Sequence, residues 1–175
     1  MASSDSFRTA LVAEAMKKTG ICWVRWAGDA RDHPVWHLWR DGAAYVVAGP
    51  GEQPLPGAET AESATVIART KDSRARLIVW EAAVSRLLPG SPEWEEVVGL
   101  LQADRLNLAD PDQVAQRWAA ECSIVRLSPT GATGEGPGAY STDDLSAAPL
   151  PTGATTRGRL PRVLHRRQTR RPRLR

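Results

Sequence analysis

The hydrophobic positions of the first eighteen residues recur with a helical spacing. Phe7, Leu11 and Ala15 are each four residues apart. Apolar residues at i, i+4 and i+8 lie on one face of an α-helix. Gly20 follows, and glycine is common just beyond the end of a helix. The pattern therefore predicts an amphipathic helix over residues 5–18.

From residue 21 onward the period changes to two, and β-branched and aromatic residues become frequent. Asp41-Gly42 lies between two such runs, and this dipeptide in that position is a strong signal for a β-hairpin. A polar turn over residues 71–74 separates a second pair of runs, the later of which is apolar on both faces and therefore predicts a central strand. The predicted strands are residues 21–26, 34–40, 43–48, 64–69, 76–87 and 122–127.

Two further helices are predicted before the last strand. Ser91-Pro92-Glu93 supplies an N-cap, a proline at the first helical position and an acid near the positive helix end. Asp110-Pro111-Asp112-Gln113 repeats the pattern, with Gln113 placed to complete a capping box. The apolar positions that follow each cap are spaced for one buried helical face.

The order of predicted elements is α-β-β-β-β-β-α-α-β, a mainly β fold with flanking helices. Short connections make the sheet mainly antiparallel, because parallel pairs need long crossovers. Six short strands with few covering helices bury both sheet faces most simply as a small, nearly closed barrel, which also removes exposed edges. We therefore predict a six-stranded antiparallel split β-barrel, with a half-open sheet covered by the helices as the alternative.

Composition and charge divide the chain into three parts. The folded domain is expected over residues 5–128, because residues 129–156 are rich in Gly, Pro, Ser and Thr and predict a disordered linker. Residues 157–175 are an arginine-rich tail, expected to be disordered, with nine arginines and no acid. With those nine removed from the 23 basic residues, residues 1–156 hold 14 basic and 20 acidic residues, a net charge of −6. A nucleic-acid or acidic partner is therefore suggested only for the tail.

The sequence also excludes several classes of protein and site. No uncharged apolar stretch approaches the roughly 18 residues of a membrane span, and residues 1–8 lack the apolar core of a signal peptide. Cys22 and Cys122 are too few for a disulfide framework. We expect a cytoplasmic protein that does not bind membranes. His33 and His37 would lie about 13 Å apart on a strand, too far for one ion, so no metal site is expected.

Two tryptophans on the second predicted strand suggest a surface with a function. Trp36 and Trp39 face opposite sides of one strand, so one of them leaves the core side. An outward tryptophan on a barrel covers a ligand or a partner subunit. We therefore expect the domain to dimerise through this surface.

Cations gather around the turn before the long strand. Arg69, Lys71 and Arg76, with Thr70 and Ser73 beside them, have the charge and hydroxyl groups to hold a phosphate. The alternative is a solvated hairpin tip whose charge is partly balanced by a neighbouring aspartate. The residues alone do not decide between these interpretations.

Several segments, in their order and spacing, carry a resemblance to a known family. They are the helix before the first strand, His-Pro-Val-Trp-His-Leu-Trp-Arg-Asp-Gly at 33–42, Gly-Glu-Gln-Pro-Leu-Pro-Gly at 51–57, Arg-Thr-Lys-Asp at 69–72 before Arg-Leu-Ile-Val-Trp at 76–80, Pro-Gly-Ser-Pro-Glu-Trp at 89–94 and Arg-Leu-Asn at 105–107. Over residues 5–128 the chain resembles the pyridoxamine 5'-phosphate oxidase-like proteins, the flavin-binding split β-barrels, and in particular a small actinobacterial branch of them.

The resemblance implies a six-stranded split barrel that forms a homodimer and binds FMN, or a related deazaflavin, at the dimer interface. Such proteins catalyse two-electron redox chemistry or hold the cofactor without catalysis. No catalytic residue is assigned by the resemblance. Together with the patterns above it gives nine candidate cofactor-binding residues: Trp36, His37, Trp39, Gly51, Gln53, Arg69, Thr70, Lys71 and Arg76.

The sequence departs from the oxidases where these hold the FMN phosphate. Their second strand carries an arginine, which aligns at or near His37, and a Ser-Arg-Lys run that follows their third strand aligns with Gly51-Glu52-Gln53. An acid thus replaces a cation; either the phosphate is held instead by Arg69, Lys71 or Arg76, or the site prefers another ligand. The catalytic residues of the vitamin-forming oxidases have no clear counterparts, which argues against that activity.

Three hypotheses follow from these observations. The first is a flavin-binding oxidoreductase, with FMN or a deazaflavin as cofactor. The second is a non-catalytic binding module that has lost the phosphate site and holds no flavin. The third places the function in the arginine-rich tail, which would contact nucleic acid or acidic partners. Residues 129–175 are expected to be dispensable for folding and for cofactor binding.

Overall fold

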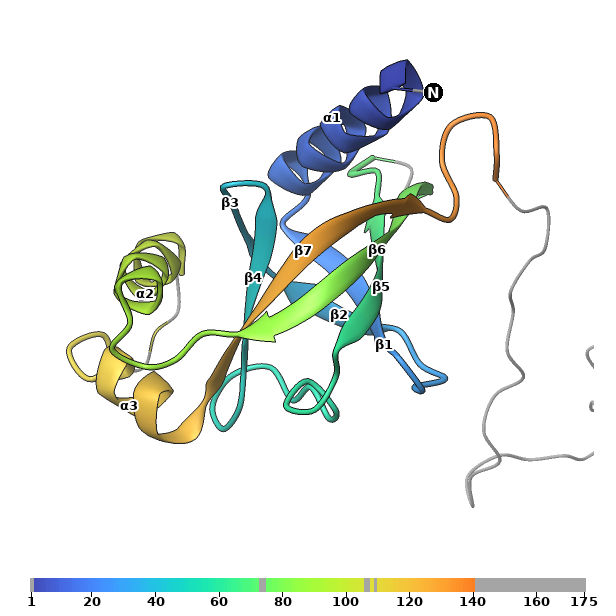
Figure 1. The fold of residues 1–175 in the computed structure, drawn as a ribbon. Coiled ribbons are helices and arrows are strands. Elements are labelled where there is room, and N and C mark those ends of the chain that lie inside the picture. Colours follow the sequence, from blue (N-terminus) through green and yellow to red (C-terminus); the bar gives the residue numbers. More distant parts are fainter. Residues whose placement is uncertain (1, 73–74, 106–107, 109, 141–175) are drawn as a thin grey trace, which may run out of the picture. The chain divides into compact units, whose positions relative to one another are not determined.

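The computed structural model describes residues 2–72, 75–105, 108 and 110–140, with side chains from Phe7 onward. Three helices and seven strands follow one another along these residues (Figure 1). Their bounds are α1 Ala2–Lys18, β1 Ile21–Trp26, β2 His33–Trp36, β3 Leu38–Arg40, β4 Ala43–Ala48, β5 Ser63–Arg69, β6 Arg76–Arg86, α2 Pro92–Asp104, α3 Val114–Glu121 and β7 Ser123–Thr133.

The strands form one antiparallel sheet in the order β2-β1-β5-β6-β7-β4-β3. Its two end strands, β2 and β3, are neighbours in the chain and are separated by His37 alone. The sheet therefore curls until its two ends meet at this residue, which gives a split barrel. The expected mainly β, antiparallel fold is confirmed.

The strand count is seven where six were predicted, and the difference lies at His37. The run 34–40 was expected to be one strand, but its first half pairs with β1 and its second half with β4. One straight strand cannot lie against both partners, because they belong to opposite ends of the sheet. The chain bends at His37 and leaves β2 with one partner and β3 with the other.

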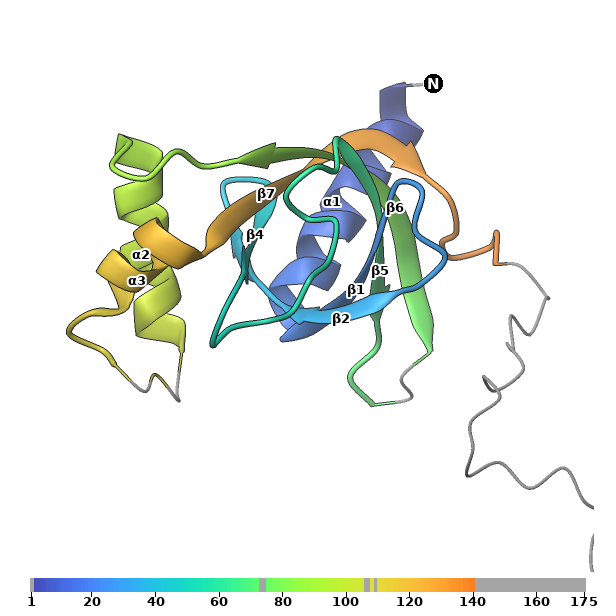
Figure 2. The same cartoon turned by 90° about the horizontal axis from the view of Figure 1, so that it is seen from below.

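The inside of the curled sheet holds the larger hydrophobic core. Inward residues of β1, β5 and β6 pack with α1, whose Met16 is 1% exposed. Figure 2 looks through the ring of strands onto α1, which lies across the far side. Burial of apolar surface at about 25 cal/mol per Å² makes this core the main stabilising element of the domain.

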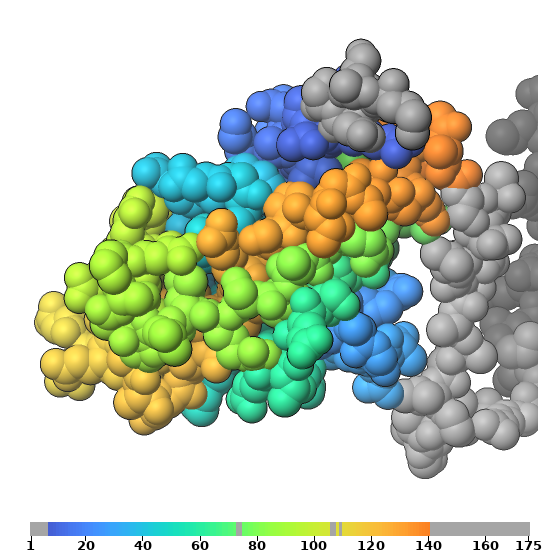
Figure 3. Space-filling model, viewed as in Figure 1, coloured from blue at the N-terminus to red at the C-terminus, as the bar shows by residue number. Residues whose placement is uncertain are grey.

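A second core lies outside the barrel, where α2 and α3 cover β4 and β7. All six residues of β4 are buried, because one face of the strand meets the barrel interior and the other meets the helices. Figure 3 shows the two helices as one lobe, green and gold, beside β3 and β4. The predicted cap of α2 is present, since Ser91 accepts a hydrogen bond from the Trp94 N–H at 3.3 Å. The predicted capping box of α3 is not, because Gln113 makes no side-chain cap bond.

The last strand continues beyond the predicted end of the domain. β7 runs to Thr133, so position 128 falls inside the strand. The cause is pairing with β6, which aligns Ala82 with Pro129 and Trp80 with Thr133 in spite of the linker-like composition. The remainder of the predicted linker from residue 141, and the tail 157–175, lie outside the described residues. Within the described part of the chain, no helix is both long and apolar enough to cross a membrane.

Candidate functional site

A hollow of about 420 Å³ opens where the barrel bends between β2 and β3. The strand junction forms one side, the link between α1 and β1 a second, and the C-terminal end of α2 a third. It is lined by Gly20, Trp36, His37, Leu38, Leu101, Asp104 and Arg105. Two of the nine predicted residues, Trp36 and His37, are therefore brought together here.

Trp36 is held in a fixed position at the wall of the hollow. Its backbone N–H donates to the Gln53 Oε1 at 2.7 Å, and its backbone carbonyl accepts from the Gln53 Nε2 at 3.1 Å. These bonds satisfy the backbone N–H and carbonyl of Trp36 on the edge of β2 that faces away from β1. The guanidinium carbon of Arg105 lies 4.6 Å from the centroid of the Trp36 ring, a cation–π contact. Gln53 thus positions Trp36 and does not itself line the hollow.

His37 presents an unprotonated nitrogen at the same junction. Its Nε2 lies 3.0 Å from the carbonyl oxygen of Met16, and a carbonyl can only accept, so Nε2 carries the proton. Burial lowers the pKa of the imidazole below its usual value of 6.5, although the bond to Met16 acts in the opposite direction. Nδ1 is buried and has no hydrogen-bond partner among the described residues. His37 is therefore neutral and offers an acceptor.

We expect this histidine to make the stability of the domain depend on pH. Because its pKa is lower in the folded state, the unfolded chain binds a proton more readily. The stabilisation is fully present above the unfolded pKa of 6.5 and is lost as the pH falls from that value through the lower folded pKa. The His37→Gln variant keeps an N–H for Met16 but does not titrate. Its melting temperature should fall less than that of the wild type between about pH 7.5 and 5.5; equal falls would contradict this.

Behind Trp36 and Arg105 lies a buried ionic cluster. The side chain of Glu52 is 0% exposed and forms ion pairs with Arg105 and with Arg117, the latter at 2.9 Å. The Trp118 Nε1 donates to the Glu52 Oε1 at 2.9 Å. Asp110 binds the other side of Arg117 at 2.8 Å, which lowers the pKa of that aspartate. We call these five residues the Glu52 cluster.

The cluster includes the segment that aligns with the phosphate-binding run of the oxidases. The predicted residue Gly51 is exposed, and a Cβ at this position would lie 3.2 Å from a guanidinium nitrogen of Arg117. The cations here are already paired with the carboxylate of Glu52. Residues 51–53 therefore stabilise the fold behind the hollow, and neither Gly51 nor Gln53 is among the residues that line it.

The predicted cation cluster lies on other strands and is largely engaged in internal contacts. The Arg69 guanidinium carbon lies 5.2 Å above the Trp23 ring, and Arg76 pairs with Glu135 at 2.8 Å. The Thr70 hydroxyl accepts a hydrogen bond from a backbone N–H across the turn at 3.1 Å. Lys71 is exposed. Ser73 lies outside the described residues.

The register of the sheet nevertheless relates Arg69 to the hollow. Trp36 is opposite Ile21, and Trp23 is opposite Ile67, so β5 beyond Ile67 runs toward the Ile21 end of β1 and ends at Arg69. Paired residues of adjacent strands point to the same face, and strands are about 4.8 Å apart. Trp36 and Ile21 thus lie side by side on the outer face, and Arg69 ends the next strand, about 10 Å from Trp36 by strand spacing; we call these three residues the outer row. Ile21, in its middle, is 58% exposed.

Trp39 lies on the other face from Trp36 and does not join the row. Its ring packs against that of Trp80 in an edge-to-face contact, with centroids 6.2 Å apart, at the edge of the barrel core. Trp36 packs against the outer core and carries Arg105 on its ring. Both tryptophans are half-buried.

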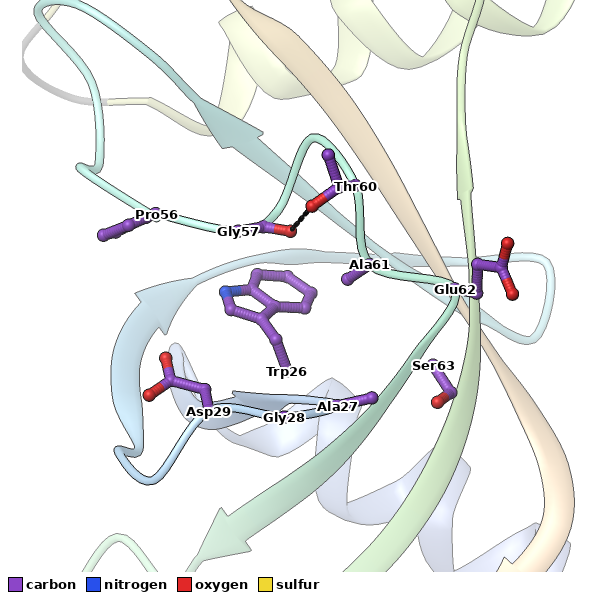
Figure 4. Close-up of a pocket in the computed structure, with 10 residues that line it drawn as sticks. All are labelled: Trp26, Ala27, Gly28, Asp29, Pro56, Gly57, Thr60, Ala61, Glu62 and Ser63. Atoms are coloured by element: carbon purple, nitrogen blue, oxygen red, sulfur yellow. Dashed lines mark hydrogen bonds between the residues drawn. The ribbon is translucent and has the colours of Figure 1, made fainter.

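A second hollow, of about 630 Å³, surrounds Trp26 (Figure 4). The indole stands between the Gly57–Ala61 segment on one side and Ala27 and Gly28 on the other. Its lining includes Asp29 and Glu62 and, among the described residues, no basic side chain. It contains none of the predicted residues and would repel an anionic cofactor. The hollow beside Trp36 is therefore the better candidate site.

Sequence reasoning missed the residues of the hollow that come from distant segments. Arg105 was noted only within an Arg-Leu-Asn motif, and Gly20 only as the end of a helix. The position of Arg105 at the end of an amphipathic helix was a signal that its charge could be used in a site. Its partner Glu52 is too far away in the sequence for a local pattern to connect the two residues.

The comparisons with known proteins show the fold. No family model matches the sequence, and no curated protein matches it significantly. HutZ, the heme storage protein from Vibrio cholerae, matches with a TM-score of 0.53 and 11% identity over 72% of this chain and 94% of that one. A candidate general stress protein 26 from Jannaschia sp. CCS1 matches with a TM-score of 0.50 and 13% identity over 71% and 74%. The resemblance to the split barrels is thus confirmed for the fold.

Proposed function

From a fold shared with the pyridoxamine 5'-phosphate oxidase-like split barrels, we propose that the domain binds a flavin-type cofactor in the hollow beside Trp36. The observation that supports this most strongly is the half-buried Trp36 indole at the wall of the hollow, whose backbone is held by Gln53 and whose strand neighbour is the exposed Ile21. A planar aromatic ring system can stack on such a surface. The bound flavin would supply two-electron redox chemistry, and the protein the position.

The cofactor is FMN in this proposal, with its phosphate directed along the outer row. Arg69 ends the row, and the exposed Lys71 follows it in the chain. Arg105 is less suitable, because its charge is already paired with Glu52. A deazaflavin would use the same surface.

The outer row also supports a homodimer, which the resemblance implies. The 58% exposed Ile21 is an apolar side chain without cover among the described residues, and an interface needs such a patch at its centre. A second copy of the chain would bury it and close the hollow. Light scattering at micromolar concentration is expected to return a dimer mass; a monomer mass would contradict this.

A second candidate function is a carrier of a ligand that has no phosphate. The Glu52 cluster favours it, because the two arginines next to the hollow are already paired with an internal carboxylate. HutZ, which shares the fold, is a heme storage protein, and His37, which lines the hollow, is of the residue type that ligates heme iron. Titration with hemin, followed by its visible absorption, separates this ligand from a flavin.

The test compares FMN with riboflavin, which differ only in the phosphate. Flavin fluorescence should show binding of both, with FMN tighter by a factor of about 10–150, as expected for a charge-assisted contact of roughly 1.5–3 kcal/mol. Equal affinities would favour a site without phosphate recognition. Absence of binding by both would contradict the proposal.

A filled-site variant links the binding to the hollow. A Cβ at Gly20 meets no atom within 4 Å, so a Gly20→Trp side chain can enter the hollow without displacing the backbone. We expect it to abolish flavin binding. Gly99 on α2 is also exposed and open, and Gly99→Trp is the matched control that should bind normally.

A further inference from the structure

The carboxylate of Glu52 is surrounded by donors that would suit a bound anion. Its two oxygens are engaged by the guanidinium groups of Arg105 and Arg117 and by the Trp118 N–H, and its side chain is fully buried. Arginine and N–H donors of this kind form the usual sites for carboxylate and phosphate groups. The protein thus has an anion site, and a residue of its own chain fills it.

The surroundings of the site explain why the carboxylate stays there. Burying a charge costs free energy unless the charge is paired and hydrogen-bonded. Glu52 and Asp110 supply two negative charges to the cluster, and Arg105 and Arg117 supply two positive charges. The cluster is therefore balanced, and no cation in it is left to attract a further anion.

Arg105 connects this site to the hollow. It lines the hollow, lies over the Trp36 ring and is paired with Glu52 at the same time. A ligand phosphate or carboxylate that approached Arg105 would have to displace Glu52. The neighbouring Asp104, which also lines the hollow, adds a negative charge.

We propose that Glu52 is an internal anion that determines the ligand specificity of the hollow: it occupies the Arg105–Arg117–Trp118 anion site, so the hollow accepts the uncharged part of a ligand at its Arg105 end. This extends the proposed function of the hollow. Its test uses inorganic phosphate and no flavin, so a failure here and a failure of flavin binding are distinguishable.

The test removes the internal anion and supplies a free one. The Glu52→Ala variant leaves two arginines facing an empty anion site, so its melting temperature in sodium chloride should fall below that of the wild type. Replacing chloride by sodium phosphate at equal ionic strength should raise it by several degrees, because phosphate binds the folded state only. The wild type should show no such difference between the two salts.

Two further variants keep the result decisive. Glu95→Ala removes an exposed carboxylate of α2 and should respond to the two salts as the wild type does. Glu52→Ser also empties the site, and it provides the same comparison if the alanine variant does not fold. Calorimetric titration with phosphate should give binding to the Glu52 variants alone. Absence of a phosphate-specific effect in both variants, or an equal effect in the wild type, would overturn the proposal.

Discussion

The Gly49→Ala variant is expected to be less stable than the wild type by roughly 3–5 kcal/mol. Gly49 has φ +148°, a conformation that L side chains rarely adopt. An added Cβ would lie 2.8 Å from the Cys122 Sγ, 2.9 Å from the Cys122 Cα and 3.0 Å from the Glu121 carbonyl oxygen. Two of these atoms belong to the backbone where α3 ends and β7 begins, so a rotamer change cannot relieve the overlap.

Denaturant unfolding of the purified chain measures this effect. Gly99→Ala is the control, because its Cβ meets no atom within 4 Å on a helix, where alanine is about 0.5–1 kcal/mol more favourable than glycine. The double variant Gly49→Ala/Cys122→Ala removes the sulfur but not the backbone overlap, so it should recover only part of the loss. A Gly49→Ala midpoint equal to that of the wild type would refute the close approach.

Ending the chain at Ser128 is expected to cost about 3 kcal/mol of stability, whereas ending it at Tyr140 should cost little. Pro129 and Thr133 pair with β6, the Gly134 N–H donates to the Val79 carbonyl at 2.9 Å, and the Val79 N–H donates to the Glu135 carbonyl at 2.8 Å. Glu135 also pairs with Arg76, and the Tyr140 hydroxyl donates to the Leu77 carbonyl at 2.9 Å. Each such bond contributes on the order of 0.5–1.5 kcal/mol.

Thermal melts of the full chain and of the two shortened chains provide the measurement. A loss of about 3 kcal/mol corresponds to roughly 6–12 °C for a domain of this size. The chain ending at Tyr140 is the matched control, because it removes residues 141–175 and keeps every described contact. Equal melting temperatures for all three would place the end of the folded domain at 128, as its composition suggested.

Local signals predicted the elements well, because they depend on neighbouring residues. The Asp41-Gly42 hairpin is present, with φ +46° and +75° at the two turn positions and Arg40 opposite Ala43. The cap at Ser91 and the helix over the first residues are also present. In each case a short stretch of sequence contains both the residues and their partners.

Features that depend on distant partners were not predictable in this way. The break at His37 arises because β2 and β3 belong to opposite ends of the sheet, which only the complete pairing order reveals. The burial of Glu52 is similar. An acid in a segment rich in glycine and proline indicates a solvated loop. Its partners are more than fifty residues away in the sequence, since Arg105 directly follows α2 and Arg117 lies on α3.

The candidate site was predicted in part for the same reason. Trp36 and His37 are adjacent in the sequence and reach the hollow together. Gly51 and Gln53 were expected beside them and lie behind them, because Gln53 binds the backbone of Trp36. Arg69 is related to the hollow only through the register of three strands, and Arg76 is taken up by Glu135.

The position of β7 in the sheet bears on how the protein is synthesised. Among the described residues β7 is the last strand to be made, yet it lies between β6 and β4. Until β7 leaves the ribosome, the β3–β4 hairpin has no hydrogen-bonded partner in the rest of the sheet. The hairpin is synthesised about 75 residues before β7, and translation adds roughly 5–20 residues per second. For several seconds the nascent chain therefore exposes the two strand edges that β7 later covers, which is when chaperone binding or misassociation of neighbouring nascent chains would occur.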